Sequence, residues 1–321
     1  MLYPLKLQAA FKDYLWGGTR LRDEFNKQTD MDPLAESWEL SCHHDGLSTI
    51  ANGEFAGMTL SDYIKQAGRQ VIGTKAPADK DFPILIKFID AKQNLSVQVH
   101  PDDAYARLHE GESGKTEMWY VIDAKPGAKL IYGFTHEISH QEFEKRIRDN
   151  TLLDVCNQVP IKKGDVFFIE AGTLHAIGAG ALIAEIQQSS NSTYRVYDYG
   201  RIGKDGKPRQ LHIEKALAVT KLQPPTHKVG AVAKLSCFAD YKLSILAQCD
   251  LFNVSCFDLE GRCSLCAKDD SFHSVLVLDG EMALAYGANS FTIKKGDSVF
   301  IPAGMGEYLL NGTGKFILTT I

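Results

Sequence analysis

Apolar residues in this chain occur mostly in short runs that end at glycine-containing turns. The clearest example is VFFI at 166–169, which follows a Lys-Gly-Asp turn and precedes an Ala-Gly turn. The same arrangement returns at 294–304, where Lys-Gly-Asp and Ala-Gly enclose SVFI. Upstream of each copy stands a further matched run, MWYVID at 118–123 and SVLVLD at 274–279. Short strands with glycine turns at this spacing predict antiparallel sandwiches or barrels rather than a parallel sheet.

Because the pattern is present twice, we expect a mainly β protein with two antiparallel barrels and a few flanking helices. Pro224-Pro225 is the best candidate for a linker, since consecutive prolines stop both helices and central strands. This divides the chain into a first unit at 1–223, which carries an N-terminal extension and a helical insertion, and a second unit at 224–321.

Two segments have the features of amphipathic helices. Residues 60–67 form a short one, whose start can be capped by Thr59 or Ser61. Residues 139–150 begin at Ser139 with the residue spacing of a capping box. The second helix falls inside the first unit and is expected to flank its barrel.

The composition is that of a globular protein, with 44% hydrophobic and 23% charged residues among 321. A net charge of −5 gives no support for a nucleic-acid partner, which calls for a basic patch. No apolar run reaches the length that crosses a bilayer, and the first residues lack the features of a signal peptide. The seven cysteines show no disulfide-framework spacing. We therefore expect a cytoplasmic protein with no membrane contact.

Two further pairs of residues invite a metal interpretation that the sequence does not favour. Cys263 and Cys266 have C-x-x-C spacing, but no second ligand pair stands near them, and we expect them in a surface turn. His43 and His44 precede an Asp-Gly pair, and we expect both to be exposed to solvent.

A set of metal-type ligands accompanies the first copy of the repeat. Gln98 and His100 are two residues apart, so a strand presents both on one face. Glu117 directly precedes the strand at 118–123, and His175 follows the Ala-Gly turn. Any one of these residues alone is more simply a polar side chain on a strand. Together, two imidazoles and a carboxylate with a position left open indicate a catalytic zinc site.

The second copy of the repeat lacks most of this set. Matching the two copies by their offsets gives Glu307 for His175, His273 for Glu117, and Val254 and Cys256 for Gln98 and His100. A complete metal site is therefore expected only in the first unit, and the strands of the second unit are expected to serve packing.

Several motifs together resemble the type I mannose-6-phosphate isomerases, most of all their short bacterial branch. The motifs are LSVQVHPD at 95–102, KTEM at 115–118, AGTLHA at 171–176 and TYRVYDY at 193–199. The resemblance covers about residues 3–220 with specific motifs, and the remainder more loosely as a second, degenerate cupin. It implies two cupin-type jelly-roll barrels and a zinc enzyme that interconverts mannose 6-phosphate and fructose 6-phosphate through a cis-enediol.

The resemblance also assigns roles to individual residues. It implies one Zn²⁺ per chain, held by Gln98, His100, Glu117 and His175. It places Arg195 and Lys115 at the reacting sugar as catalytic residues and Ser96 beside the substrate. Larger relatives carry a phosphate-contacting lysine six residues after the arginine; Arg201 stands there in this chain, and a guanidinium suits bidentate phosphate contact.

Some questions stay open at the level of sequence. The base that moves the proton between C2 and C1 is Lys115, Glu36, Glu185 or a zinc-bound hydroxide. Two other function classes fit a cupin with metal ligands: a sugar-binding protein without turnover, and an iron-dependent dioxygenase. The expected partner is a small phosphosugar, and the chain is expected to be a monomer or a small homo-oligomer.

Overall fold

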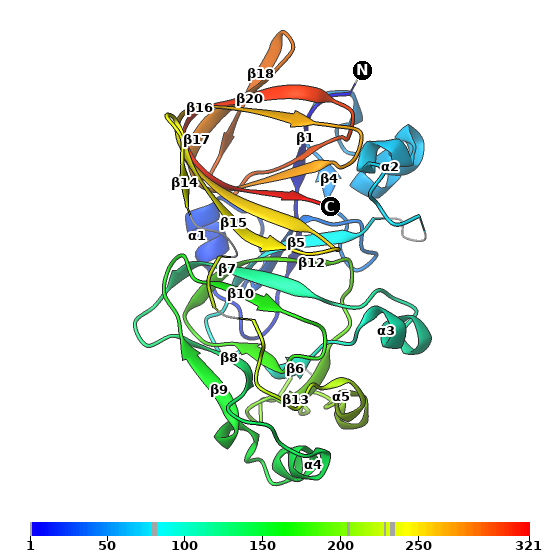
Figure 1. Ribbon diagram of the computed structural model, residues 1–321, viewed down its shortest axis with the longest axis vertical. Coiled ribbons are helices and arrows are strands. Elements are labelled where there is room, and N and C mark those ends of the chain that lie inside the picture. The colour runs from blue at the N-terminus through cyan, green and yellow to red at the C-terminus, as the bar shows by residue number, and fades with distance from the viewer. Residues whose placement is uncertain (1, 79–81, 204–205, 228, 232–234) are drawn as a thin grey trace.

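The computed structural model describes residues 2–78, 82–203, 206–227, 229–231 and 235–321. Figure 1 shows two β-rich units stacked along the long axis, with the N- and C-termini both in the upper unit. Every strand pairing between named strands is antiparallel. The prediction of a mainly β chain with antiparallel sheets and a few helices is therefore confirmed.

The upper unit is built on a nine-stranded sheet that combines C-terminal and N-terminal strands. Its order is β14-β15-β16-β20-β17-β19-β1-β4, and β18 pairs with β17. The strands are β1 (Leu5–Gln8), β4 (Thr49–Ile50), β14 (Ser236–Cys237), β15 (Tyr241–Gln248), β16 (Asn253–Ala267), β17 (His273–Tyr286), β18 (Asn289–Lys294), β19 (Ser298–Ile301) and β20 (Gly306–Thr320). A cut at residue 224 stays a prediction. Strand β1 pairs across it with β19, and β4 joins the same sheet by pairing with β1.

The lower unit contains two sheets. The six-stranded sheet runs β10-β7-β12-β5-β3-β2, with β2 (Ala10–Lys12), β3 (Glu36–Leu40), β5 (Ile84–Asp90), β7 (Glu117–Ala124), β10 (Val166–Ile169) and β12 (Ala181–Gln188). The five-stranded sheet runs β13-β6-β11-β8-β9, with β6 (Val97–Val99), β8 (Lys129–Phe134), β9 (Cys156–Pro160), β11 (His175–Ile177) and β13 (Tyr194–Tyr197).

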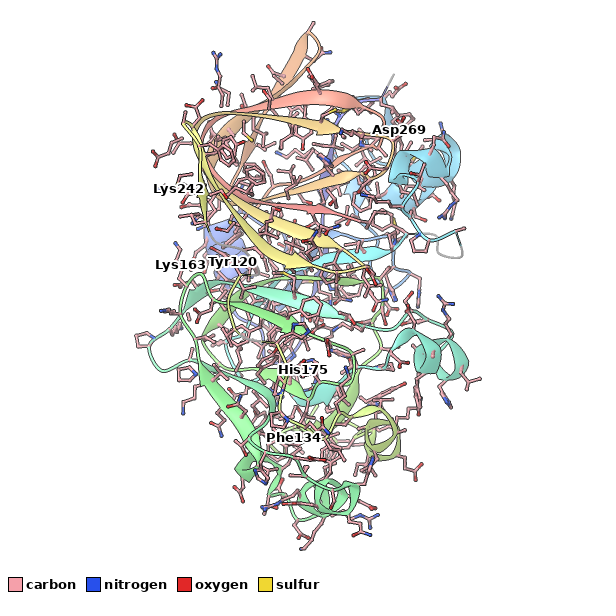
Figure 2. The ribbon with its side chains drawn as sticks, viewed as in Figure 1. Tyr120, Phe134, Lys163, His175, Lys242 and Asp269 are labelled. Atoms are coloured by element: carbon pink, nitrogen blue, oxygen red, sulfur yellow. The ribbon has the colours of Figure 1, made fainter. Side chains whose placement is uncertain are left out.

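Strand β7 packs against an apolar core on each of its two faces, which explains why its sequence is apolar without a clear alternation. Trp119 and Val121 pack into the core of the lower unit. Met118 and Tyr120 pack into a second core that also contains Phe300 of the upper unit. Tyr120 accordingly lies at the junction of the two units (Figure 2). A strand with apolar cores on both faces reads as a continuous apolar run.

The sequence repeat is also a repeat of pairing register. In the lower unit β7 pairs with β10 so that Glu117 faces Ile169. In the upper unit β17 pairs with β19 so that His273 faces Ile301. These are the residues that the sequence match sets against each other, which supports a duplicated β unit.

The five α-helices of the described residues are peripheral: α1 (Arg20–Phe25), α2 (Leu60–Ala67), α3 (Asp103–His109), α4 (His140–Arg148) and α5 (Ile213–Val219). Short 3-10 turns lie at Gly53–Phe55, Arg69–Ile72 and Leu152–Asp154. The helices predicted at 60–67 and 139–150 are confirmed. Thr59 caps the first by accepting from the Asp62 N–H, and Ser139 caps the second by accepting from the Glu142 N–H. None of the helices described is long and apolar enough to cross a membrane.

Two expectations about single residues are wrong. Cys263 and Cys266 lie inside the long strand β16 rather than in a turn, because every residue of β16 pairs with β20. Three residues apart on a strand, they face opposite sides, with Cys263 buried and Cys266 exposed. His43 is buried rather than exposed, while His44 is 76% exposed at its side chain. The ring of His43 packs edge-on against Trp38.

Candidate metal centre and active site

The two sheets of the lower unit bring the predicted ligands together although they are far apart in sequence. His100 follows the end of β6, Glu117 begins β7, and His175 begins β11. Their ligand atoms lie within 4.8 Å of one another, and all three side chains are buried. Figure 2 shows His175 inside the lower unit, between its sheets. Gln98 is the cross-strand neighbour of both His175 and Arg195, because β6 lies between β11 and β13 in the five-stranded sheet.

Each of the two imidazoles makes a hydrogen bond through Nδ1 that determines the tautomer of the ring and leaves Nε2 available to a metal ion. Nδ1 of His100 lies 2.9 Å from the Ser192 carbonyl oxygen, and Nδ1 of His175 lies 2.8 Å from the Thr173 carbonyl oxygen. A carbonyl only accepts, so each Nδ1 carries the proton and donates it. In the neutral ring, each Nε2 then presents a lone pair, and a backbone carbonyl that orients a ligating histidine in this way is usual at metal sites.

The free donor atoms have the spacing of a metal coordination shell. The two Nε2 atoms are 3.1 Å apart, His175 Nε2 is 3.4 Å from Glu117 Oε1, and His100 Nε2 is 3.7 Å from Glu117 Oε2. Tetrahedral ligands at the usual bond lengths to zinc lie about 3.3 Å from one another. The three side chains therefore fit a small divalent cation without rearrangement.

Glu117 carries the clearest sign that a cation belongs here. Its Oε1 is buried and has no hydrogen-bond partner, although such an atom usually has one. Lys115 donates from Nζ to Glu117 Oε2 at 2.6 Å and to His100 Nε2 at 2.9 Å, so one positive charge already faces these donors. His175 Nε2 faces His100 Nε2 and Glu117 Oε1, so in both contacts one lone pair lies opposite another. A metal ion bound between these atoms would satisfy all of them.

Burial sets the protonation of the ligands. It lowers the pKa of His175 to about 3 and that of His100 well below its usual range, with the charge of Lys115 acting in the same direction. Both rings are therefore neutral at neutral pH, as metal binding requires. Burial and the charge of Glu185 raise the pKa of Glu117, so metal binding would compete with a proton there.

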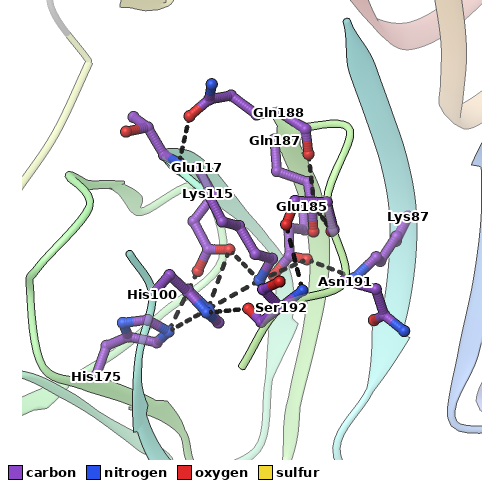
Figure 3. A network of polar contacts seen from close by, with 12 residues as sticks. Lys87, His100, Lys115, Glu117, His175, Glu185, Gln187, Gln188, Asn191 and Ser192 are labelled. Atoms are coloured by element: carbon purple, nitrogen blue, oxygen red, sulfur yellow. Dashed lines mark hydrogen bonds and ion pairs between the residues drawn. The ribbon is translucent and has the colours of Figure 1, made fainter. Parts of the chain in front are cut away.

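A network of buried charges lies beside the three ligands (Figure 3). Lys87 Nζ is 3.1 Å from Glu185 Oε1 and 3.8 Å from Glu36 Oε2. Trp119 Nε1 donates to Glu185 Oε2 at 2.8 Å. Burial alone would raise the pKa of Glu185, but the charges of Lys87 and Lys115 outweigh it and lower that pKa, so the carboxylate is ionised at neutral pH.

A cavity of about 280 Å³ joins these groups to the surface of the lower unit. Its walls include Tyr14, Trp16, Glu36, Lys87, Ser96, Gln98, Lys115, Glu185, Arg195 and Arg209. Arg195 is held in place by donating from Nε to Ser96 Oγ at 3.2 Å and from a terminal nitrogen to the Gln210 carbonyl at 3.0 Å. The cavity wall therefore contains six of the residues singled out in the sequence: Glu36, Ser96, Gln98, Lys115, Glu185 and Arg195. His100, Glu117 and His175 are not part of this wall, and Lys115, which contacts His100 and Glu117, lies between them and the cavity.

Arg201 stands apart from this group. Its guanidinium donates to the carboxylate of Asp198 and lies over the ring of Tyr199, and the residue does not border the cavity. Asp198 also accepts from Arg209, with Nε of that residue 2.7 Å from Asp198 Oδ2. The buried carboxylate of Asp198 therefore accepts hydrogen bonds from two guanidinium groups. Of these two arginines, Arg209 borders the cavity.

Sequence reasoning missed Lys87 and Arg209. The sequence does contain an indication that Lys87 is functional, because it is the only charged residue in the apolar run at 84–89. A lysine in a strand that is buried along its whole length requires a carboxylate partner, and here it has Glu185 and Glu36. The sequence contains no such indication for Arg209, because this residue follows a polar loop and its role depends on its contact with Asp198.

Family models match both units. Residues 4–128 match phosphomannose isomerase type I, catalytic domain, and residues 242–321 match mannose-6-phosphate isomerase, cupin domain. The chain is 39% identical over 323 residues to the probable mannose-6-phosphate isomerase GmuF of Bacillus subtilis, with 99% of each chain covered. It is 37% identical over 318 residues to the mannose-6-phosphate isomerase of Streptococcus mutans, covering 99% of this chain and 98% of that one.

The fold agrees with solved structures. The crystal structure of the mannose 6-phosphate isomerase from Bacillus subtilis matches with a TM-score of 0.90 and 37% identity, covering 99% of both chains. The apo form of the enzyme from Salmonella typhimurium, at 18% identity, matches with a TM-score of 0.77 and shares the fold.

Proposed function

The chain belongs to the type I mannose-6-phosphate isomerases, and from that premise we propose that it interconverts mannose 6-phosphate and fructose 6-phosphate at a single zinc ion in the lower unit. The observation that carries the proposal is the convergence of His100, Glu117 and His175 on one point, with their free donor atoms about as far apart as tetrahedral zinc ligands.

We assign Gln98 as the fourth ligand of the zinc ion, leaving the open side of the metal to the substrate. Gln98 is a neighbour of His175 across the strand pair and borders the cavity. When bound, the zinc ion acts as a Lewis acid that stabilises negative charge on the sugar oxygens next to the carbon losing its proton. Two neutral imidazoles with a carboxylate and an amide oxygen favour zinc over magnesium or calcium.

Arg195, the cross-strand neighbour of Gln98, supports the same charge. Its guanidinium is permanently cationic and is held by Ser96 and the Gln210 carbonyl, so it needs no reorganisation when charge develops. Ser96 also borders the cavity, and its hydroxyl is placed to contact the sugar. These two residues therefore orient the C1–C2 end of the substrate.

Lys115 is our candidate for the proton transfer from C2 to C1. It borders the cavity, and its Nζ lies 2.6 Å from Glu117 Oε2 and 4.0 Å from Glu185 Oε1. A base that moves this proton must lie within hydrogen-bond reach of the substrate, and the place of Lys115 on the cavity wall supports this role. Glu36 and Glu185 remain rival bases, because both also border the cavity.

The phosphate group is assigned to the arginine pair on Asp198. Guanidinium groups bind phosphate oxygens bidentately, and Asp198 fixes both Arg201 and Arg209 from behind. Arg209 faces the cavity, and Arg201 reinforces the positive charge there. A dianionic sugar phosphate would then lie with its phosphate at these arginines and its carbonyl end at the zinc ligands.

We further propose a cellular setting, a domain division and an assembly state for the chain. All seven cysteines are free thiols, which suits a reducing cytoplasm. We propose a division into a catalytic cupin at 1–223 and a degenerate cupin at 224–321, with β1 pairing across it to β19. The chain is proposed to act as a monomer or small homo-oligomer without nucleic-acid or membrane partners.

The decisive experiment measures fructose 6-phosphate formed from mannose 6-phosphate by the purified chain, before and after removal of metal with a chelator. We expect turnover that disappears on chelation and returns when one equivalent of Zn²⁺ is added. Turnover restored only by Fe²⁺ would contradict the zinc assignment. Absence of turnover with every divalent metal would mean that the chain binds the sugar phosphate without converting it.

A further inference from the structure

The segment 190–192 connects the candidate metal centre to a carboxylate outside it. Ser192 is the residue whose carbonyl oxygen accepts from Nδ1 of His100, and Figure 3 shows this contact at the edge of the buried network. Nothing in regular secondary structure holds Ser192, because the segment lies between the end of β12 and the start of β13. Its position must therefore come from side-chain contacts.

Gln187 Nε2 donates to the Ser190 carbonyl and Asn191 Nδ2 donates to Asp45 Oδ2, both at 2.7 Å. Among the residues that the structure describes, Glu112 is the one side chain that makes hydrogen bonds to all three residues of the segment. Its Oε2 accepts from Ser190 Oγ at 3.2 Å, from the Asn191 backbone N–H at 3.2 Å and from Ser192 Oγ at 3.1 Å. Three consecutive residues thus donate to one carboxylate oxygen. Hydrogen bonds to an ionised acceptor are stronger than those between neutral groups, so Glu112 fixes the course of the backbone here.

The other oxygen of Glu112 is held by His43. The Asp45 N–H donates to Nδ1 of His43 at 3.1 Å, which leaves the ring proton of the neutral imidazole on Nε2. That Nε2 lies 3.3 Å from Glu112 Oε1 and donates to it. His43, the residue that is buried against expectation, is therefore the second anchor of the carboxylate.

The same geometry argues against a second metal site at this place. His43, His44 and Glu112 are close enough together to share an ion. For His43 Nε2 to ligate a metal, however, its proton would have to move to Nδ1, which faces the donating Asp45 N–H. The cluster is therefore a hydrogen-bond relay that ends at Glu112.

We propose that Glu112 is a positioning residue of the metal centre, which holds the segment 190–192 so that the Ser192 carbonyl accepts from Nδ1 of His100 and fixes the orientation of its ring. The inference rests on the proposed function in so far as His100 is a zinc ligand. Outer partners of this kind orient the ligand and hold its free nitrogen toward the metal. Glu112 acts through two intermediate contacts and does not touch the substrate.

Four variants test this role. In Glu112→Ala the segment loses its acceptor. In Glu112→Gln the charge is removed, but an amide oxygen can still accept from the segment, so a positioning role and a simple charge effect are separated. Glu24→Ala is the matched control, because Glu24 is a half-exposed carboxylate that pairs with Arg20 on α1, away from the site. Ser190→Ala, which removes one donor to Glu112, is a milder substitute should Glu112→Ala fail to fold.

The first readout is the affinity for Zn²⁺, measured by competition with a chromophoric chelator, with thermal unfolding recorded alongside. We expect Glu112→Ala to bind Zn²⁺ roughly 10- to 100-fold more weakly, the usual effect of removing an outer partner. Glu112→Gln should stay much nearer to the native affinity, and Glu24→Ala should match it. Equal losses in the alanine and glutamine variants, or no loss in either, would overturn the proposal.

The second readout needs no metal. Nitrogen-15 NMR of the histidine side chains in metal-free protein reports which ring nitrogen of His100 carries the proton. Lys115 still donates to Nε2 in every variant, so the proton stays on Nδ1 and the readout is the strength of its hydrogen bond to the Ser192 carbonyl. We expect the same Nδ1–H resonance in the native chain and in Glu24→Ala, and in Glu112→Ala a shift toward the value of a ring without this hydrogen bond. An unchanged Nδ1–H resonance in Glu112→Ala would contradict the proposal. Failure of the native chain to bind Zn²⁺ would instead contradict the proposed function, and this measurement would still decide the role of Glu112.

Discussion

At the scale of single residues, the candidate metal centre depends on what each ligand does with its other polar atoms. His100 and His175 each give one ring proton to a backbone carbonyl, and this leaves two lone pairs facing the carboxylate of Glu117. Lys115 alone satisfies only part of this set, because Glu117 Oε1 keeps no hydrogen-bond partner. The cost of burying such groups is met when a cation binds between them.

His175→Ala tests the ligand assignment. We expect the variant to bind zinc at least about 100-fold more weakly, since loss of even an outer partner costs roughly 10- to 100-fold. Isomerase activity should be lost with the metal, while circular dichroism should still show a cooperative thermal transition. The control is His136→Ala, an exposed histidine outside the site. One equivalent of metal retained by His175→Ala would rule out this ligand.

At the scale of elements, the end of β13 is organised by one acidic side chain. Asp198 follows directly after β13 and is buried, while Arg201 and Arg209 both donate to it. Burial by itself would raise the pKa of Asp198, but the hydrogen bonds from Arg209 and Arg201 outweigh it and lower that pKa. The loop that presents Arg209 to the cavity is therefore stabilised by an ionised carboxylate.

Asp198→Asn tests this through pH. Because the folded pKa is lower than the unfolded one, the carboxylate stabilises the fold at every pH above the ordinary aspartate value of about 4. This contribution is lost as pH falls from there through the folded pKa. We expect the variant to lose about 2 kcal/mol of unfolding free energy at pH 7. Urea titrations should show the difference from native protein unchanged between pH 7 and 5 and shrinking below about pH 4; a constant difference down to pH 3 would contradict an ionised Asp198.

At the scale of the whole molecule, the two units share a core. The largest apolar cluster contains Phe88 and Ile186 from the six-stranded sheet together with Phe252 and Phe300 from the upper unit. Strand β1 adds a backbone connection, since Leu5 pairs with Phe300. The six-stranded sheet packs on one face against the five-stranded sheet and on the other against the upper unit. Loss of either neighbour would expose apolar surface to water. The upper unit therefore packs against the sheet that carries Glu117 and Glu185.

Phe88→Ala tests the coupling of the two units. Phe88 is fully buried against Phe25, and removal of such a ring costs roughly 3–5 kcal/mol. We expect a lower melting temperature with one transition that is the same by circular dichroism and by loss of activity, because both units unfold together. The control is Phe238→Ala, whose side chain is half exposed. Two separated transitions in the variant would mean that the units are independently stable.

The resemblance of the motifs to a known family suggested Arg195 and Lys115 as site residues. The sequence by itself determined the β character of the chain, its duplication, the helices at 60–67 and 139–150, and the four candidate ligands. These features depend on local patterns: apolar runs, turn residues, cap residues and the two-residue spacing of Gln98 and His100. The tertiary structure decided what depends on contacts between distant segments. It buried His43 beside Glu112, placed Cys263 within a long strand, turned Arg209 rather than Arg201 toward the cavity, and set Lys87 against Glu185. A side chain's charge and burial depend on its neighbours in space, and for these residues the neighbours are separated by 11 to about 100 positions in the sequence.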